Sequence, residues 1–164
     1  MPTRPSDYAY DLFISYSHDD KEWVRGWLLP RLEMVGLRVC MDFRDFVVGV
    51  PFVTNMERAV ASSGKTLVVL SDAWVNSQWT QFERLLTQSA EPLKRTIPLL
   101  LEPCQPPAGI TMLTYADFTR QEKWEAQLQR VVAAIRGELR LREVGPLLGG
   151  LLAPADVPFL VPFI

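Results

Sequence analysis

The sequence KTLVVLSDAWVNSQWTQFE, residues 65–83, contains the clearest strand signal in this chain of 164 residues and the start of the segment behind it. Its first part, KTLVVLS over residues 65–71, holds four consecutive aliphatic side chains, which is typical of a strand buried on both faces. The segment that follows has apolar residues at helical spacing: Trp79, Phe82, Leu85 and Leu86. The stretch therefore predicts a buried strand followed by an amphipathic helix that runs to about residue 90.

Similar strand signals recur on both sides of this stretch. Each is a short apolar run, and they are YDLFISY (10–16), LRVCMD (37–42), TIPLLL (96–101) and YADF (115–118). Helical patterns separate them: one after residue 20, one that begins at Pro51 and is stopped by Gly64, and a last one over 122–142. Residues 43–50, FRDFVVGV, are expected to form a loop.

The first helix has signals for its start, its middle and its end. Asp19 or Asp20 can cap its amino end, and Gly36 ends it. Pro30 lies inside the pattern, so we expect a kink or a separate turn there.

The alternation of strands and helices predicts an α/β protein. We expect a flavodoxin-like three-layer fold, in which helices flank both faces of a five-stranded parallel sheet. Ligands of such sheets bind outside the carboxyl ends of the strands, where the strand order reverses. Polar residues follow those ends at 15–17, 42–45 and 71–72, so the sequence predicts where a site would lie but not its chemistry.

Composition excludes several classes of protein. The net charge is −2 and the pI is about 5.5, so no broad basic field favours nucleic acid. Cys40, Cys104 and the single His18 supply no cage for a metal and no disulfide framework. The first ten residues lack the apolar run of a signal peptide, so a cytoplasmic location is expected. His18 by itself indicates a structural or surface residue.

Four motifs occur in an order that resembles the Toll/interleukin-1 receptor (TIR) domain family. They are DLFISYSHDD (11–20), RDFVVG (44–49), LVVLSDAWVNSQWTQFE (67–83) and the closing DF (117–118). RDFVVG carries Val48 where the family usually has proline, and Thr80 replaces a frequent cysteine. The resemblance covers roughly residues 8–141, and we expect a TIR domain over 1–142.

The resemblance implies two alternative functions. Some TIR domains cleave NAD between nicotinamide and ribose, using the glutamate of a Trp-x-x-x-Glu helix, which corresponds here to Trp79 and Glu83. This predicts an NAD nucleosidase that releases nicotinamide and ADP-ribose or a cyclised product, with Glu83 catalytic, NAD as substrate and no cofactor. Other members only recruit one another. From the residues alone, a glutamate in an early helix turn is most often a solvated charge that favours the helix dipole.

Further residues are predicted to hold the substrate. Trp79 would form one wall of the pocket that binds ribose and nicotinamide, and Phe46 or Phe52 would supply an aromatic face for the nicotinamide ring. Polar contacts would come from three residues at the strand ends: Ser15, Tyr16 and Asp42.

Two apolar segments indicate contacts with other domains. Phe46, Val47, Val48 and Val50 make the loop costly to leave in water, which indicates contact with a neighbour. The resemblance implies that this loop mediates self-association into oligomers or filaments, through Arg44, Asp45, Val47, Val48 and Gly49. Arg44 and Asp45 by themselves are also compatible with a simple ion pair on the surface. Residues 143–164 form an apolar tail rich in proline and glycine, which is expected to be a linker or to dock on a fused or separate sensor. Its prolines and Asp156 argue against a membrane span.

The excess of arginine over lysine, with frequent alanine, leucine and proline, fits a GC-rich bacterial genome. Bacterial TIR domains that deplete NAD serve immune signalling and antiviral defence, which is the setting that the resemblance implies.

Overall fold

A single parallel sheet organises the part of the chain that this computed structural model describes, residues 8–89 and 91–137. Within those ranges its strands are β1 (Tyr10–Ser15), β2 (Val39–Cys40), β3 (Ser63–Leu70), β4 (Thr96–Leu100) and β5 (Ala116–Asp117). They lie in the order β2-β1-β3-β4-β5, and each neighbouring pair is parallel. The predicted five-stranded flavodoxin-like sheet is confirmed, and its strand order reverses between β1 and β3.

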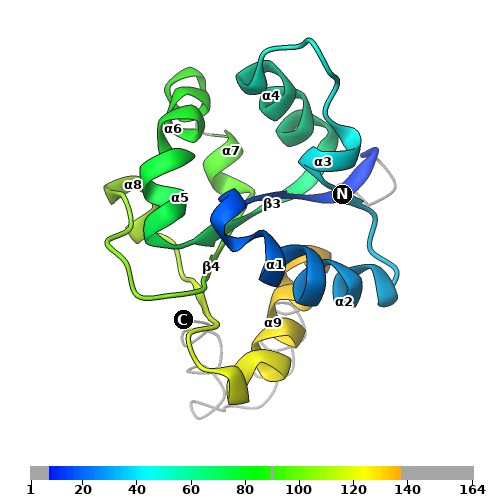
Figure 1. The fold of residues 1–164 in the computed structure, drawn as a ribbon, viewed down its shortest axis with the longest axis vertical. Coiled ribbons are helices and arrows are strands. Elements are labelled where there is room, and N and C mark those ends of the chain that lie inside the picture. Colours follow the sequence, from blue (N-terminus) through cyan, green and yellow to red (C-terminus); the bar gives the residue numbers. More distant parts are fainter. Residues whose placement is uncertain (1–7, 90, 138–164) are drawn as a thin grey trace, which may run out of the picture.

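Helices cover both faces of this sheet, giving three layers (Figure 1). One face holds α1 (Lys21–Trp23), α2 (Leu29–Met34) and α9 (Trp124–Arg136); the other holds α4 (Phe52–Ser62), α5 (Asp72–Ser77), α6 (Trp79–Gln88), α7 (Glu91–Lys94) and α8 (Ala108–Thr111). Alternate residues of β3 point into the two separate cores: Leu67 and Val69 join one, and Val68 and Leu70 join the other. This double burial explains the continuous apolar run of the strand.

The first helix differs from its prediction in its cap and in its interior. Asp20 occupies the N-cap position of α1, as predicted, but its side chain makes no capping bond there. The side-chain cap comes one turn earlier, where Ser17 Oγ accepts the Asp19 N–H at 3.2 Å at the start of the 3-10 turn η2 (His18–Asp20). The helix then continues through α1 and a π-helical segment, η3 (Val24–Leu28), before Pro30 in the first turn of α2. The extra residue in a π turn accommodates a proline that cannot donate a hydrogen bond.

The predictions for Gly64 and for the loop at residues 43–50 were also wrong. Gly64 does not stop α4, which ends at Ser62; it lies in β3, where an added Cβ would meet the Asp11 carbonyl at 3.2 Å. The segment 43–50 is not all loop, because the helical turn α3 (Asp42–Asp45) occupies its start. β2 is accordingly shorter than the six residues predicted.

Later elements are also more divided than the sequence pattern suggested. Gln78 separates α5 from α6, and α6 ends at Gln88. α7 and α8 were not predicted. The turn η4 (Gln121–Lys123) precedes α9, which ends at Arg136 because Gly137 adopts a left-handed conformation with φ 67°.

The boundary predicted at residue 142 and the tail 143–164 lie outside the described residues. Among the helices that are described, none is long and apolar enough to cross a membrane.

Candidate functional site

A narrow cleft lies at the carboxyl ends of β1 and β2. Residues from β1, α3, α4 and the α5–α6 junction line it: Phe13, Ile14, Ser15, Tyr16, Asp42, Phe46, Phe52, Met56 and Gln78. Five of the predicted substrate residues therefore meet in one place, although their role toward NAD stays a prediction. The open volume is only about 10 Å³, which is the room that a single water molecule needs.

Aromatic rings form one wall of the cleft. Phe46 lies 5.8 Å from Phe13 between ring centroids at an interplanar angle of 27°, and 5.5 Å from Phe52 at 62°. Phe46 is half-buried, whereas Phe52 is 41% exposed. Phe52 is thus the ring with a free face for a ligand, and Phe46 supports it.

A hydrogen-bonded network forms the polar wall of the cleft. The Tyr16 hydroxyl donates to Asp42 Oδ1 at 2.7 Å and accepts from Arg25 Nε at 2.8 Å. His18 Nε2 lies 2.9 Å from Asp42 Oδ2. Burial, followed by the hydrogen bond to Asp42, raises the pKa of Tyr16 far above its ordinary value. Tyr16 therefore stays a neutral donor at any physiological pH.

His18 and Arg25 are members of this network that the sequence pattern did not reveal. His18 is the third residue after the end of β1 and directly follows Ser17, and that position near a strand end was its one visible signal. Its partner Asp42 is 24 residues away, so only the fold brings the pair together.

Ser15 serves the core as well as the cleft. Its Oγ accepts the Trp74 indole N–H at 3.0 Å, and only 2% of the residue is exposed. This bond holds α5 against β1, since Trp74 is fully buried between them. The hydroxyl predicted to contact the substrate is thus engaged in positioning α5.

α6 carries the two residues of the Trp-x-x-x-Glu pattern beside the cleft. Trp79 is half-buried, with ring centroids 6.0 Å from Trp74 and 6.4 Å from Phe82. Glu83, one turn later, is exposed and makes no hydrogen bond or ion pair within the described ranges. Gln78, directly before α6, lines the cleft, whereas Trp79 and Glu83 lie outside its lining.

The predicted assembly loop is anchored at its base and exposed at its tip. Arg44 pairs with Glu33 at 2.6 Å and Asp45 at 3.6 Å, and the bond to Glu33 is the main reason that its pKa is raised. Val47 and Val48 are 53% and 97% exposed, and Gly49 has φ 89°. The tip therefore presents apolar side chains to any neighbouring domain.

Buried Asn55 of α4 holds this loop from below. Its Oδ1 accepts the Val47 N–H at 3.0 Å, and its Nδ2 donates to the carbonyls of Val47 at 3.1 Å and Val50 at 3.4 Å. The one sequence signal for this role was an amide beside Met56 on the inward face of a helix.

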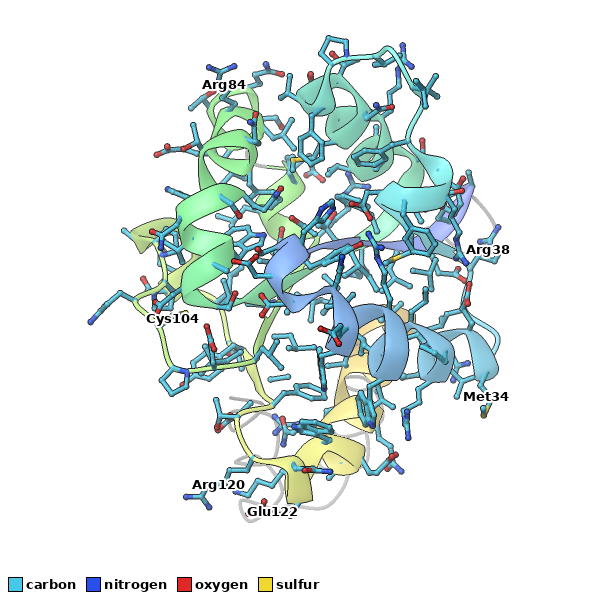
Figure 2. All side chains as sticks on the ribbon, viewed as in Figure 1. Met34, Arg38, Arg84, Cys104, Arg120 and Glu122 are labelled. Atoms are coloured by element: carbon cyan, nitrogen blue, oxygen red, sulfur yellow. The ribbon has the colours of Figure 1, made fainter. Side chains whose placement is uncertain are left out.

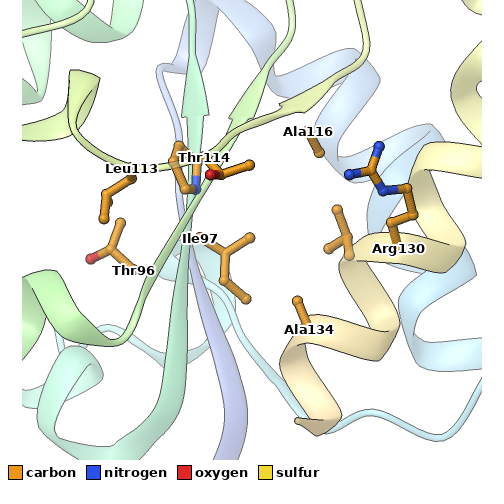
Figure 3. A pocket seen from close by; sticks show the side chains of 9 residues that line it. Thr96, Ile97, Leu113, Thr114, Ala116, Arg130 and Ala134 are labelled. Carbon is orange, nitrogen blue, oxygen red and sulfur yellow. The ribbon is translucent and has the colours of Figure 1, made fainter. Parts of the chain in front are cut away.

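Larger cavities lie elsewhere. One of about 280 Å³ runs between the starts of β4 and β5 and α9 (Figure 3), and its lining is apolar apart from two threonines and Arg130. Another, of about 220 Å³, adjoins Cys104, whose thiol pKa is raised by burial. Neither lining includes a carboxylate, so neither can stabilise a developing cation.

The fold and the cleft together define a parallel α/β domain with a closed site next to the reversal of strand order. A family model described as "TIR domain" matches residues 12–132. The match covers well over half of the sequence, so this chain belongs to the TIR domain family.

Animal receptors are among its relatives. The chain is 38% identical over 112 residues to Toll-like receptor 2 type-2 of Gallus gallus, which is 63% of this chain and 14% of that protein. It is 40% identical over 74 residues to Toll-like receptor 1 of Homo sapiens, covering 45% of this chain and 9% of the receptor. The chain thus spans a small part of these receptors, and they do not support the bacterial source that composition suggested.

Solved structures agree with the fold. The TIR domain of the Toll-related receptor TRR-2 from Hydra magnipapillata matches with a TM-score of 0.69 at 27% identity, covering 78% of this chain and 99% of that one. A metazoan TIR-STING receptor from C. gigas, in complex with 2',3'-cGAMP, matches with a TM-score of 0.61 at 24% identity, covering 83% of this chain and 41% of that one. The second likeness concerns the fold alone.

Proposed function

We propose that this domain cleaves NAD between nicotinamide and ribose once self-association has opened the cleft. The observation that carries the proposal is the gathering of Tyr16, Asp42 and Phe52 in one cleft, beside the helix that bears Glu83. Glu83 is the catalytic carboxylate of this proposal, and NAD is the substrate.

One carboxylate suffices for this bond. Nicotinamide attached to ribose is a cationic pyridinium, so it leaves as a neutral molecule without protonation. The ribose develops positive charge as the bond breaks, and a preorganised anion stabilises that charge. The Glu83 carboxylate is available for this role because no cation or donor in the described ranges engages it, and in this proposal self-association fixes it beside the ribose. Asp42, by contrast, is committed to Tyr16 and His18.

Opening of the cleft is a requirement of the proposal. Sites for ligands of this size enclose several hundred cubic ångströms, roughly 300–1,000, whereas this cleft holds about 10 Å³. Phe46 and Phe52 are packed against each other in its lining, and they flank the exposed loop tip at Val47 and Val48 in the sequence. Docking of that tip on a second TIR domain would move the loop and turn the Phe52 ring aside, so that Glu83 faces the ribose.

The product and the setting complete the proposal. Attack of water on the ribose cation gives ADP-ribose, and attack by another group of the same substrate molecule gives a cyclised product. Loss of NAD, or the product itself, would then act as a signal in immunity or antiviral defence in the cytoplasm. A sensor that contacts residues 143–164 would supply the trigger.

A second function is favoured by a specific observation. Val48 is 97% exposed at the tip of an apolar loop, which suits a module that only recruits other TIR domains. The printed names of its relatives, Toll-like receptors, agree with a signalling role.

The experiment that separates the two functions measures nicotinamide release from NAD over a range of protein concentrations. We expect release to rise steeply with concentration and to fall about 10²–10³-fold in Glu83→Gln. Glu122→Gln is the matched control, because Glu122 is exposed at the far end of the molecule from Arg84 of α6 (Figure 2). A wild-type sample that is oligomeric by light scattering and releases no nicotinamide would establish the recruitment function instead.

A further inference from the structure

We infer that His18, held by Asp42, is the general base that takes the proton from the water molecule that attacks the ribose. The inference rests on the proposed cleavage of NAD and adds a second catalytic residue to it. It concerns the capture step, whereas Glu83 acts while the bond to nicotinamide breaks.

The contact with Asp42 determines which imidazole nitrogen is basic. Asp42 Oδ2 lies 2.9 Å from His18 Nε2, and an ionised carboxylate can only accept a hydrogen bond. Neutral His18 therefore carries its proton on Nε2, and the lone pair remains on Nδ1. A carboxylate also orients the histidine base of a Ser-His-Asp triad, although there it bonds Nδ1 and leaves Nε2 as the base, so the two ring nitrogens exchange roles here.

Asp42 is itself fixed by other residues. Only 14% of its side chain is exposed. Its Oδ1 accepts a hydrogen bond from the Tyr16 hydroxyl at 2.7 Å and lies 3.9 Å from Arg25 Nη2 in an ion pair. Arg25 also donates to Tyr16. Tyr16 and Arg25 therefore hold the Asp42 carboxylate in place, with Oδ2 directed toward His18.

The turn that carries His18 is fastened at both ends. Ser17 Oγ accepts the Asp19 N–H, and Asp20 Oδ2 accepts the Ser71 hydroxyl at 2.6 Å, which ties the turn to the end of β3. The imidazole lies 5.9 Å from the Tyr16 ring between centroids, and Tyr16 lines the cleft. His18 thus lies outside the lining of the cleft but against two residues of that lining, Tyr16 and Asp42, and 66% of its side chain is open to solvent.

In the capture step the attacking water must lose a proton, and His18 is the group to which we assign it. The C1′–N bond has broken, and its electron pair has left with neutral nicotinamide. A lone pair of the attacking water forms the new C1′–O bond, and one water proton passes to His18 Nδ1. The resulting imidazolium is stabilised by Asp42 and then releases its proton to solvent.

A nucleophile without a proton separates this role from a structural one. A neutral pyridine, such as 3-acetylpyridine, attacks the same C1′ through its ring nitrogen and has no proton to lose. We expect His18→Gln to lower ADP-ribose formation about 10²-fold, while the rate of exchange with 3-acetylpyridine stays within about twofold of wild type. Lys21→Gln, an exposed change on the neighbouring turn, should leave both rates unchanged.

The outcomes distinguish the inference from the proposed function. Equal loss of hydrolysis and exchange in His18→Gln, or no loss of either, overturns the role of His18 and leaves NAD cleavage standing. A wild-type oligomer that performs neither reaction overturns both. Because His18 is the only histidine, its imidazole ¹⁵N shifts give a test without substrate. In the neutral form of the ring we expect the proton on Nε2, and a proton on Nδ1 contradicts the inference.

Discussion

The cleft beside β1 and the cavity beside α9 differ in volume and in chemistry. The cleft holds about 10 Å³, yet Asp42, Tyr16 and His18 form an ordered polar network at it. The cavity holds about 280 Å³, with Arg130 as the one charged residue of its lining. Open volume therefore marks where side chains fail to fill space, whereas a catalytic site depends on polar groups held in fixed positions.

The largest difference between the cleft and the cavity is expected when one member of the polar network in the cleft is changed. Asp42→Asn removes the charge that orients His18, so we expect ADP-ribose formation to fall about 10²-fold. The ADP-ribose formed by oligomeric protein is measured by chromatography of the reaction mixture. The cavity variant Ala134→Leu should retain wild-type activity, and equal losses in the two variants would show that the two regions do not differ in function.

The next largest effect concerns the stability of the loop that closes the cleft. Asn55→Ala leaves the Val47 N–H and the carbonyls of Val47 and Val50 without their buried partner. We expect the free energy of unfolding to fall by about 1–3 kcal/mol, and the Val47 amide to exchange faster with solvent. Denaturant unfolding and hydrogen exchange measure the two effects. Unchanged exchange would mean that Asn55 does not hold the loop.

A smaller effect is expected at the tip of the same loop. Val48→Asp adds a charge to a side chain that is 97% exposed, so folding should be unaffected while self-association weakens about tenfold. Analytical ultracentrifugation measures the association. Met112→Asp, at a residue 83% exposed elsewhere, is the matched control, and an equal loss there would point to a general effect of charge.

The smallest effect belongs to the apolar cavity itself. Ala134→Leu places three more carbon atoms in the space beside Ile97 and Val131, and we expect it to raise the free energy of unfolding by about 0.5–1 kcal/mol. Thermal unfolding measures the change. A marked fall in stability would show that the cavity cannot accept the larger side chain.

Local patterns predicted the sheet well, because a strand buried on both faces needs apolar residues at every position. β3 and β4 occur where the runs KTLVVLS and TIPLLL lie. Breaks between helices were predicted less well. The sequence around Gln78 gives only a weak signal for the separation of α5 and α6, since Asn76 and Ser77 precede it but no proline or glycine lies there.

The candidate site was predictable only in part. Tyr16, Asp42 and Phe52 were expected at strand ends and at a helix start, and they meet in the cleft. His18 and Arg25 were not expected, because their partners are distant in the sequence. The placement of Trp79 and Glu83 outside the lining was likewise invisible in their spacing.

The sequence by itself determined the three-layer parallel fold and the family, because periodicity and local motifs are properties of neighbouring residues. Only the tertiary structure decided that Ser71 binds Asp20 across 51 positions, that Asp42 orients His18, and that the cleft is closed. Hydrogen bonds between distant residues and the volume between packed side chains depend on how strands and helices are placed relative to one another. That placement comes from burial of the whole chain and is absent from any short stretch of it.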